Sequence, residues 1–141
     1  MISTDLLLLI NITKVQAIIS RKFDALSVYG LSFSDFTILH ILNNSSEYKI
    51  RRIDLAEKVG LTASGITRLL NPLEKIGLIS REANDRDARV SYVVITDTGK
   101  RVFEEAKKTA ESITAEILSS KKYKSLKNFS ELLFELGGNI Q

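Results

Sequence analysis

The chain has 141 residues, 44% of them hydrophobic, with no cysteine, one histidine and a formal charge of +3. This length and apolar content fit one globular domain that buries its own core. The sequence pI of about 9.2 permits nucleic-acid binding without the heavy charge of a non-specific DNA coat. The lack of cysteine excludes disulfides, thiolate metal sites and thiol redox switches, and a lone histidine excludes a multi-histidine metal site.

Residues 1–29 are predicted to form a long amphipathic helix that ends before Gly30, because apolar side chains recur there at helical spacing. They are Leu8, Ile12, Val15, Ile19, Phe23 and Leu26. The run from Leu6 to Ile10 is shorter than the roughly 20 apolar residues of a membrane span. No basic segment precedes it as in a signal peptide. We therefore expect the surplus leucines to face a partner chain rather than a membrane.

A second helix is predicted from a serine cap, at Ser32 or Ser34, to the polar stretch 43–46. Its His40 has no Ser/His/Asp arrangement around it, which favours a packed or interface histidine. Residues 48–53 are short and basic and fit a small edge strand. Within them, Arg51 or Arg52 either contacts phosphate or lies in a solvated bend.

Residues 52–79 are predicted to form two short helices joined by a tight turn at Gly60-Leu61, with Gly60 in the left-handed conformation that ends a helix. Leu61 is expected to pack beneath the pair, and Thr62 or Ser64 to cap the second helix. The expected buried side chains are Ile53, Leu55, Ala56 and Val59, then Ile66, Leu69, Leu70, Leu73 and Ile76. The opposite face carries small or hydrogen-bonding residues that suit a major groove: Thr62, Ala63, Ser64, Thr67, Arg68 and Asn71.

Two residues inside the second of these helices disfavour it. Gly65 is roughly 1 kcal/mol worse than alanine in a helix, which indicates either close approach of another backbone or fraying near the helix start. Pro72 removes the amide that would bond to the carbonyl of Arg68, so a kink or break is expected near Asn71.

Two β-type runs, at 80–82 and 90–95, flank a polar tip that carries Arg86 and Arg89. Asn84-Asp85 supplies the turn chemistry, since both side chains hydrogen-bond to their own backbone. Arginine fits a narrow minor groove, where negative potential is concentrated. A self-compensated surface loop is the alternative interpretation.

A further helix is predicted from Thr96 or Asp97, then a break at 119–122, then a final helix from about Tyr123 to the Gly137-Gly138 stop. The apolar residues of the first are Val102, Phe103, Ala106, Ala110, Ile113, Ile117 and Leu118, and those of the second are Leu126, Phe129, Leu132, Leu133, Phe134 and Leu136. With the first helix, they exceed what a domain of this size covers alone, so terminal helices of two chains are expected to intertwine.

The chain carries a set of short motifs in this order: Asp54-Leu55-Ala56, Ser64 with Ile66-Thr67-Arg68, residues 73–79, Asp87-x-Arg89, and Val93-Val94-Ile95-Thr96-x-x-Gly99. In this order and spacing, the stretch from about Ile53 to Ala106 resembles the winged helix-turn-helix of MarR-family transcriptional regulators. No single motif is diagnostic, but their combination is a strong signal.

The resemblance implies a mainly α (α+β) fold with a small β-hairpin wing, in one domain over 1–141. Residues of about 1–30 and 100–141 would form dimerisation helices, and about 31–99 the DNA-binding lobe. The implied function is a homodimeric, sequence-specific repressor of a pseudo-palindromic operator in a bacterial or archaeal cytoplasm, with double-stranded DNA as partner and no cofactor. An enzyme is disfavoured, because the chain lacks a phosphate-binding glycine loop and a cysteine nucleophile. A winged helix used only for protein assembly is the alternative.

The resemblance also implies roles for individual residues. Arg89 would enter the minor groove, held by a salt bridge from Asp87, while Arg86 would contact a phosphate. Family members bind small, often aromatic ligands between the dimer helices and the winged lobe. Tyr29, Phe36 and His40 are the candidates for such a site here, with packing in the core as the alternative for each. The lack of cysteine excludes the peroxide-sensing mode of part of the family.

Overall fold

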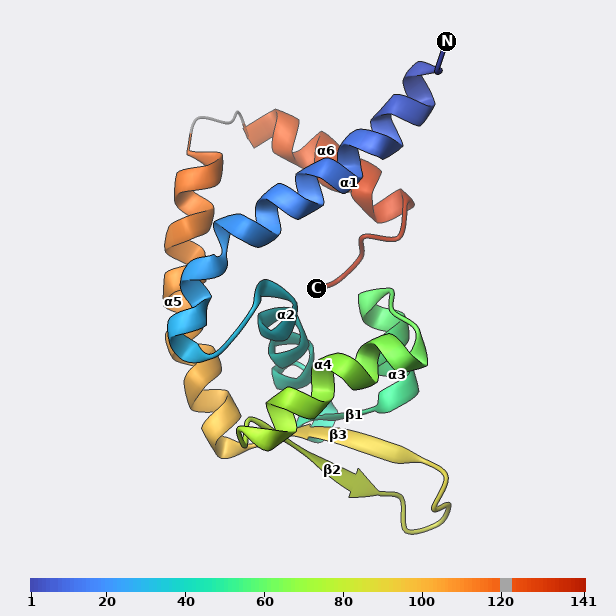
Figure 1. Cartoon of the computed structure of the whole chain (residues 1–141), viewed down its shortest axis with the longest axis vertical. Coiled ribbons are helices and arrows are strands. Elements are labelled where there is room, and N and C mark those ends of the chain that lie inside the picture. The colour runs from blue at the N-terminus through green and yellow to red at the C-terminus, as the bar shows by residue number, and fades with distance from the viewer. Residues whose placement is uncertain (120–122) are drawn as a thin grey trace.

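The computed structural model describes residues 1–119 and 123–141, which form a winged lobe beneath a region of longer helices (Figure 1). It is mainly helical with one small sheet, as predicted. In chain order the elements are α1 (Thr4–Lys22), the 3₁₀ helix η1 (Asp24–Tyr29), α2 (Phe33–Asn43), the 3₁₀ helix η2 (Ser46–Tyr48), β1 (Lys49–Arg51), α3 (Arg52–Val59), α4 (Ala63–Lys75), β2 (Ile79–Ala83), β3 (Ser91–Ile95), α5 (Asp97–Leu118) and α6 (Tyr123–Glu135).

The N-terminal helix is shorter than predicted. α1 ends at Lys22, and η1 continues the chain to Gly30, which has a left-handed φ of 76°. The expectation that Leu8 and Val15 fill the core is wrong for a single chain, since they are 45% and 47% exposed. The reason is geometric, because α1 projects away from the lobe (Figure 1). Ile19 near its end packs against the core partly buried, and Phe23 and Leu26 after it are buried.

The helix α2 begins at the first of the two predicted serine caps. Ser32 Oγ accepts from the Asp35 N–H at 3.1 Å, and Asp35 Oδ2 accepts from the Ser32 N–H at 2.9 Å. This reciprocal capping box satisfies two amides that a helix start leaves without partners. It fixes α2 so that Ile38, Leu39 and Leu42 lie fully buried at the centre of the lobe.

The sheet is antiparallel with the strand order β1-β3-β2. The predicted edge strand exists as β1 and pairs Lys49 with Val94 of β3. β2 and β3 form the hairpin of the wing, in a register that pairs Ile79 with Ile95. Val93, Ile95 and Ile79 are buried in the core, so the base of the wing is fixed to the lobe while its tip extends away from it (Figure 1).

The two C-terminal helices differ in how much they bury. α5 begins at the Thr96 cap and buries Phe103, Ala106 and Ala110 against the lobe. α6 ends at Glu135 before Gly137, close to the predicted stop, and leaves Phe129 and Phe134 about half exposed. The predicted break at 119–122 lies outside the described residues, apart from Ser119. In the described part of the chain, none of the helices has the length and apolar character needed to span a membrane.

Candidate nucleic-acid interface

The turn between α3 and α4 has the predicted geometry. Gly60 adopts a left-handed φ of 73°, and the Leu61 N–H donates to the carbonyl of Ala56 at 2.9 Å. Two residues expected inside are not buried, since Ile53 is 63% and Leu61 39% exposed. α3 has only eight residues, of which Leu55 and Ala56 are buried in the core and Val59 packs against it partly buried. The turn therefore carries Leu61 on the surface beside Gly65 rather than beneath the two helices.

The start of α4 is fixed by its cap. Thr62 Oγ1 accepts from the Gly65 N–H at 3.0 Å and lies 3.2 Å from Ser64 Oγ. A Cβ at Gly65 would lie 3.2 Å from the same Thr62 oxygen, closer than an ordinary van der Waals contact. The glycine thus makes room for the cap, a reason that neither interpretation of the sequence included.

Of the kink or break predicted near Asn71, the break is wrong, because α4 runs without interruption from Ala63 to Lys75. Leu70 and Leu73 are both buried on either side of Pro72 and hold this turn against the core. Ile76, expected in the buried stripe, is 53% exposed. It is the residue after the last helical position, where the chain turns towards Gly77.

The predicted contact face of α4 is exposed at Thr62, Ala63, Ser64, Arg68 and Asn71, and half-buried at Thr67. The residues of this face differ in whether their side chains already form hydrogen bonds within the chain. The Thr67 hydroxyl donates to the carbonyl of Ala63 at 3.0 Å, and Asn71 Oδ1 accepts from Arg81 at 2.6 Å. Arg68 has no hydrogen bond or ion pair to any described residue, so its guanidinium is available to a ligand.

Arg51 and Arg52, predicted either to contact phosphate or to lie in a solvated bend, both form hydrogen bonds within the chain. Arg51 donates to both carboxylate oxygens of Asp54, at 2.8 and 3.1 Å, and this hydrogen bond lowers the pKa of Asp54. Arg52 Nη1 donates to the carbonyl of Ala63 at 3.2 Å and to Thr67 Oγ1 at 3.3 Å. Arg52 is therefore attached to α4. Its partners are 11 and 15 residues away, a separation at which local patterns carry no signal.

The tip of the wing presents Arg89 to solvent. Asp87 Oδ1 accepts from the Arg89 N–H at 3.0 Å, and the carboxylate binds Nε and Nη2 at 3.1 and 3.3 Å. The side chain of Arg89 nevertheless remains 91% exposed. Its hydrogen bonds lower the pKa of Asp87, with the side-chain bond as the largest cause. The salt bridge that the resemblance implies is thus present, and it holds an exposed guanidinium at the tip.

Asparagine chemistry shapes the same turn, as expected. Asn84 Oδ1 accepts from the Arg86 N–H at 2.8 Å, which closes a short turn at the end of β2.

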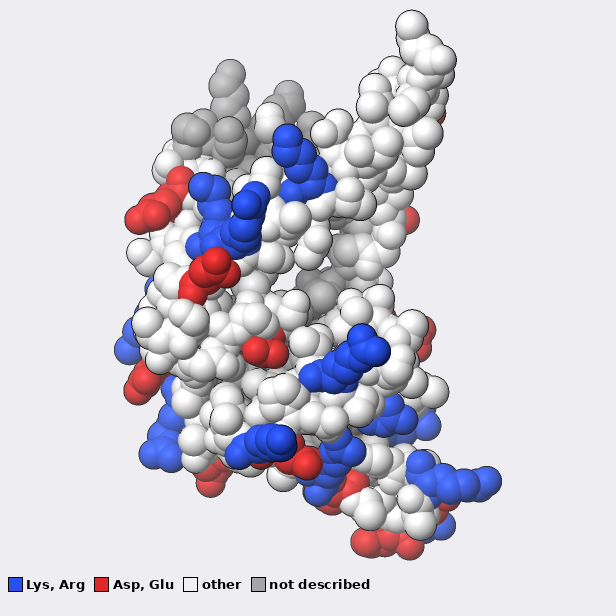
Figure 2. Space-filling model, in the orientation of Figure 1, with Lys and Arg blue, Asp and Glu red and all other residues white. Residues whose placement is uncertain are grey.

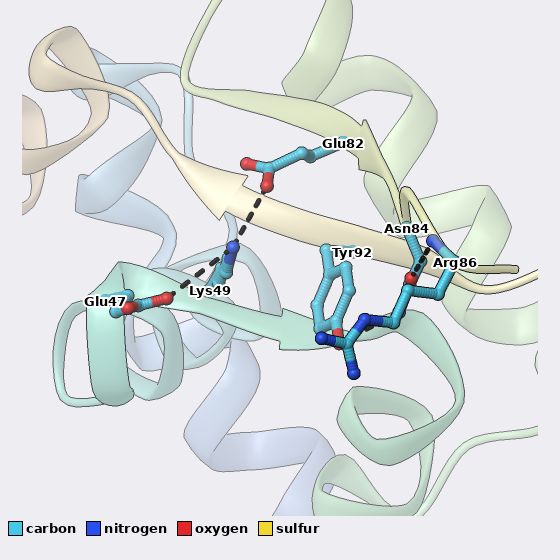
Figure 3. Close-up of polar contacts among 6 residues, drawn as sticks. All are labelled: Glu47, Lys49, Glu82, Asn84, Arg86 and Tyr92. Carbon is cyan, nitrogen blue, oxygen red and sulfur yellow. Dashed lines mark hydrogen bonds and ion pairs between the residues drawn. The ribbon is translucent and has the colours of Figure 1, made fainter.

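Lower on the wing, Lys49 donates to Glu82 at 2.9 Å, lies 3.6 Å from Glu47, and sits 5.1 Å from the centre of the Tyr92 ring (Figure 3). The hydrogen bond with Glu82 raises the pKa of Lys49. Lys49 therefore ties the edge strand to the wing and is already neutralised within the chain.

Charge is distributed unevenly over the face shown in Figure 2. Blue and red side chains alternate over the lobe, and both blue and red side chains protrude at the wing. The projecting half of α1 is almost entirely white. Its residues 6–10 are each between 44% and 51% exposed, so this rod leaves apolar side chains in water.

The candidate ligand residues do not form one site. Tyr29 Oη lies 2.7 Å from Thr109 Oγ1, which ties η1 to α5. Phe36 stacks on Phe103 at 5.1 Å between ring centres, and His40 Nε2 is 2.9 Å from the carbonyl oxygen of Gln141. Phe36 and His40 line a cavity of about 390 Å³, together with Phe33, Phe103 and Lys107, but Tyr29 is not part of its lining.

A second cavity, of about 380 Å³, lies between α1, α2 and α6. Apolar residues of all three helices line it: Leu8, Ile12, Val15, Phe33, Phe129 and Leu133. Among residues 1–119 and 123–141, no group of three or more histidine or acidic side chains is placed to hold a metal ion.

Comparisons with known proteins agree with this geometry. The model of the MarR family matches residues 31–91. The uncharacterized HTH-type transcriptional regulator YdgJ of Bacillus subtilis (strain 168) is 30% identical over 133 residues, which cover 94% of this chain and 79% of that protein. The structure of Sco3205, a MarR family transcriptional regulator from Streptomyces coelicolor in complex with DNA, superposes with a TM-score of 0.85 at 18% identity and covers 96% of this chain and 88% of that one. The structure of CouR from Rhodococcus jostii RHA1, bound to p-coumaroyl-CoA, superposes with a TM-score of 0.78 at 19% identity. This match covers 89% of this chain and 88% of the CouR chain.

Proposed function

The chain belongs to the MarR family of DNA-binding transcriptional regulators, and from this premise we propose that it is a homodimeric repressor of a pseudo-palindromic operator. Members of this family are regulators rather than enzymes. One observation carries the proposal. The exposed N-terminal half of α4, with the unengaged Arg68, and the exposed guanidinium of Arg89 belong to the same winged lobe.

α4 serves as the recognition helix in the major groove. Thr62, Ala63 and Ser64 lie at its exposed N-terminus, where small side chains let the backbone approach the bases and phosphates. Arg68 donates to base edges, for which guanine O6 and N7 are the matching acceptors. Thr67 and Asn71 complete the contact face, but Thr67 has already committed its hydroxyl proton and Asn71 accepts from Arg81.

The wing supplies the second contact. Arg89 enters the minor groove, where a planar, permanently charged group is favoured by the concentrated negative potential. Asp87 limits the directions in which Arg89 can point, which reduces the entropy lost on binding. Arg86, exposed at the same tip, contacts a phosphate. Phosphate contacts set affinity and its salt dependence, while base contacts set the sequence.

Residues 1–30 and 100–141 form the dimerisation region of the single domain, and residues 31–99 form the DNA-binding lobe. The apolar rod of α1 and the exposed aromatic rings of α6 support this division, because a second copy would remove both from water. Twofold pairing then places two recognition helices in successive major grooves, about 34 to 36 Å apart.

A small aromatic acid is proposed as the effector. The cavity lined by Phe33, Phe36 and Phe103 offers aromatic walls, and its lining also includes Lys107, a partner for a carboxylate, and Glu111. CouR, which shares the fold, was crystallised with p-coumaroyl-CoA. A ligand lodged between the lobe and the dimer helices would favour a half-site spacing that does not fit the operator, and DNA would weaken ligand binding in equal measure.

The deciding experiment selects bound sequences from a random duplex pool and inspects them for twofold symmetry. The double variant Arg68→Ala/Arg89→Ala should lose binding to the selected operator and remain a dimer in sedimentation. An assembly module would instead enrich no sequence and tolerate both substitutions. A monomer at micromolar concentration would refute the symmetric two-site arrangement, and titration of aromatic acids into the DNA complex tests the effector.

A further inference from the structure

Helix α4 contains two residues that weaken it from within. Gly65 lies in its first turn, where glycine loses more conformational freedom on folding than any other residue. Pro72 lies in its third turn and has no N–H, so the carbonyl of Arg68 lacks the partner that an α-helix would provide. The helix nonetheless runs unbroken from Ala63 to Lys75, so contacts outside its own backbone must stabilise both turns.

An arginine from outside the helix spans the first weak turn. Arg52, at the start of α3, donates through Nη1 to the carbonyl of Ala63 at 3.2 Å and to Thr67 Oγ1 at 3.3 Å. Its two acceptors lie on either side of Gly65 in the sequence. Arg52 thus joins Ala63 and Thr67, which lie on either side of the glycine.

A second arginine spans the other weak turn. Arg81, in the middle of β2, donates through Nη2 to Asn71 Oδ1 at 2.6 Å, and its Nε lies 3.0 Å from Glu74 Oε2. These two partners lie on either side of Pro72. An arginine can only donate, so the oxygen of the Asn71 amide must face Arg81. Because Arg81 belongs to the wing strand, the same contacts also join the wing to α4.

We propose that Arg52 and Arg81 are positioning residues for operator recognition, each holding in helical shape a turn of α4 that its own sequence weakens. The inference rests on the proposed reading of DNA by α4. A helix held in shape before binding loses less entropy when it enters the groove. Removing either arginine should therefore weaken sequence-specific binding, while attraction to DNA of any sequence should remain.

Direct contact of these arginines with phosphate would give a different signature. Each lost phosphate contact makes the negative slope of log affinity against log salt less steep by about 0.9. It also weakens binding to all sequences alike. A positioning residue leaves the slope unchanged and lowers the ratio of operator affinity to random-duplex affinity. The two roles are thus separable on the same set of proteins.

The test uses the full chain with Arg81→Ala, Arg81→Lys and Arg52→Ala, and Arg51→Ala as a matched control that pairs only with Asp54. The double variant Pro72→Ala/Arg81→Ala returns the missing amide to α4. Circular dichroism first establishes that each protein is folded. Two quantities are then measured: amide hydrogen exchange of the peptide 69–76 in the free protein, and affinity for the selected operator and for a random duplex across a salt series.

Arg81→Ala should speed exchange in the peptide 69–76 and lower operator affinity about tenfold, the scale of one charge-assisted hydrogen bond. Affinity for the random duplex and the salt slope should not change. Arg52→Ala should lower operator affinity in the same way, Arg81→Lys should restore part of the loss, and Pro72→Ala should restore most of it. Arg51→Ala should leave the exchange of α4 unchanged.

Two results would overturn the inference: unchanged exchange and operator affinity in Arg81→Ala, or a reduced salt slope with uniform loss across sequences. Failure of the proposed function has a separate signature. If the wild-type protein enriches no duplex sequence, the proposed operator recognition is wrong. Amide hydrogen exchange of the peptide 69–76 then decides by itself whether Arg81 holds the turn.

Discussion

Thr96 donates its hydroxyl to the backbone carbonyl of Gly77 at 2.6 Å. The same oxygen accepts from the N–H of Gly99 at 3.0 Å, and the Thr96 N–H donates to the carbonyl of Leu78 at 3.1 Å. One residue thus caps α5 and ties it to the turn that ends α4. Movement of the long helix α5 is therefore coupled to the end of α4, the proposed recognition helix.

Thr96→Val should destabilise the protein by about 2 kcal/mol, because it removes an N-cap and leaves the Gly77 carbonyl without its donor. Urea unfolding followed by circular dichroism measures the free energy of unfolding. Thr96→Ser keeps the hydroxyl and should cost less than half as much. Equal losses in the two variants would show that the hydroxyl does not carry the effect.

Gly99→Ala should destabilise the protein by about 1 to 3 kcal/mol, the usual cost of an overpacked site. A Cβ at this position would overlap the carbonyl oxygen of Leu78, which is backbone and cannot rotate away. Thr98→Ala, at an exposed neighbouring position, is the control and should stay within about 0.5 kcal/mol. An unchanged midpoint for Gly99→Ala would contradict this packing.

Arg68→Ala and Arg86→Ala should affect DNA binding in different ways. Loss of Arg68 should cost about 1 to 3 kcal/mol and relax the preference at one base pair in each half-site. Loss of Arg86 should weaken binding to all sequences and reduce the salt slope by about 0.9 per protomer. Binding to a panel of operators with single base-pair changes, at several salt concentrations, separates the two. A reduced salt slope for Arg68→Ala and a relaxed base preference for Arg86→Ala would contradict this assignment.

Asp54 and Asp87 should titrate below the ordinary range of aspartate, because Arg51 and Arg89 lower their pKa. A carboxylate with a lowered pKa contributes stability above its unfolded pKa of about 3.9, and this contribution is lost as the pH falls through the folded value. Carboxyl-carbon NMR measures both midpoints. Arg89→Ala should return the midpoint of Asp87 to the ordinary range without moving that of Asp54. An Asp87 midpoint that does not change in this variant would exclude the Arg89–Asp87 ion pair in solution.

Leu7→Glu should convert the proposed dimer into a monomer, because it places a charge within the apolar rod of α1. Sedimentation velocity at micromolar concentration gives the oligomeric state directly. Ile53→Glu is the control, since Ile53 is also apolar and exposed but lies in α3, outside the proposed dimerisation region. If Leu7→Glu remains dimeric, α1 is not at the centre of the interface.

Most of the helix boundaries could be predicted because they depend on local chemistry. Ser32, Thr62 and Thr96 were all predicted as caps, each as one of two candidates, and each satisfies an amide within three residues of itself. Gly60 takes the left-handed φ that ends α3. The wing was likewise predictable, since two β-type runs around an Asn-Asp turn form a hairpin with little influence from the rest of the chain.

Burial and long-range contacts were harder to predict. Ile53 and Ile76 have the spacing of core residues but lie at helix ends, where periodicity does not show that the chain has already left the core. Of the kink or break predicted near Asn71, the break does not occur, and Leu70 and Leu73 are buried on either side of Pro72. The attachment of Arg52 and Arg81 to α4 depends on how separate elements pack, so the sequence pattern gave no sign of it.

If the protein is the proposed dimeric repressor, the leucine-rich rod of α1 would make control of transcription depend on the concentration of the protein. If only a second copy shelters the rod, then well below the dissociation constant of the dimer the number of paired molecules rises with the square of the protomer concentration, by mass action. Halving expression in that range would leave about a quarter of the operator-competent species. Such a repressor would release its target sharply as cells dilute it by growth.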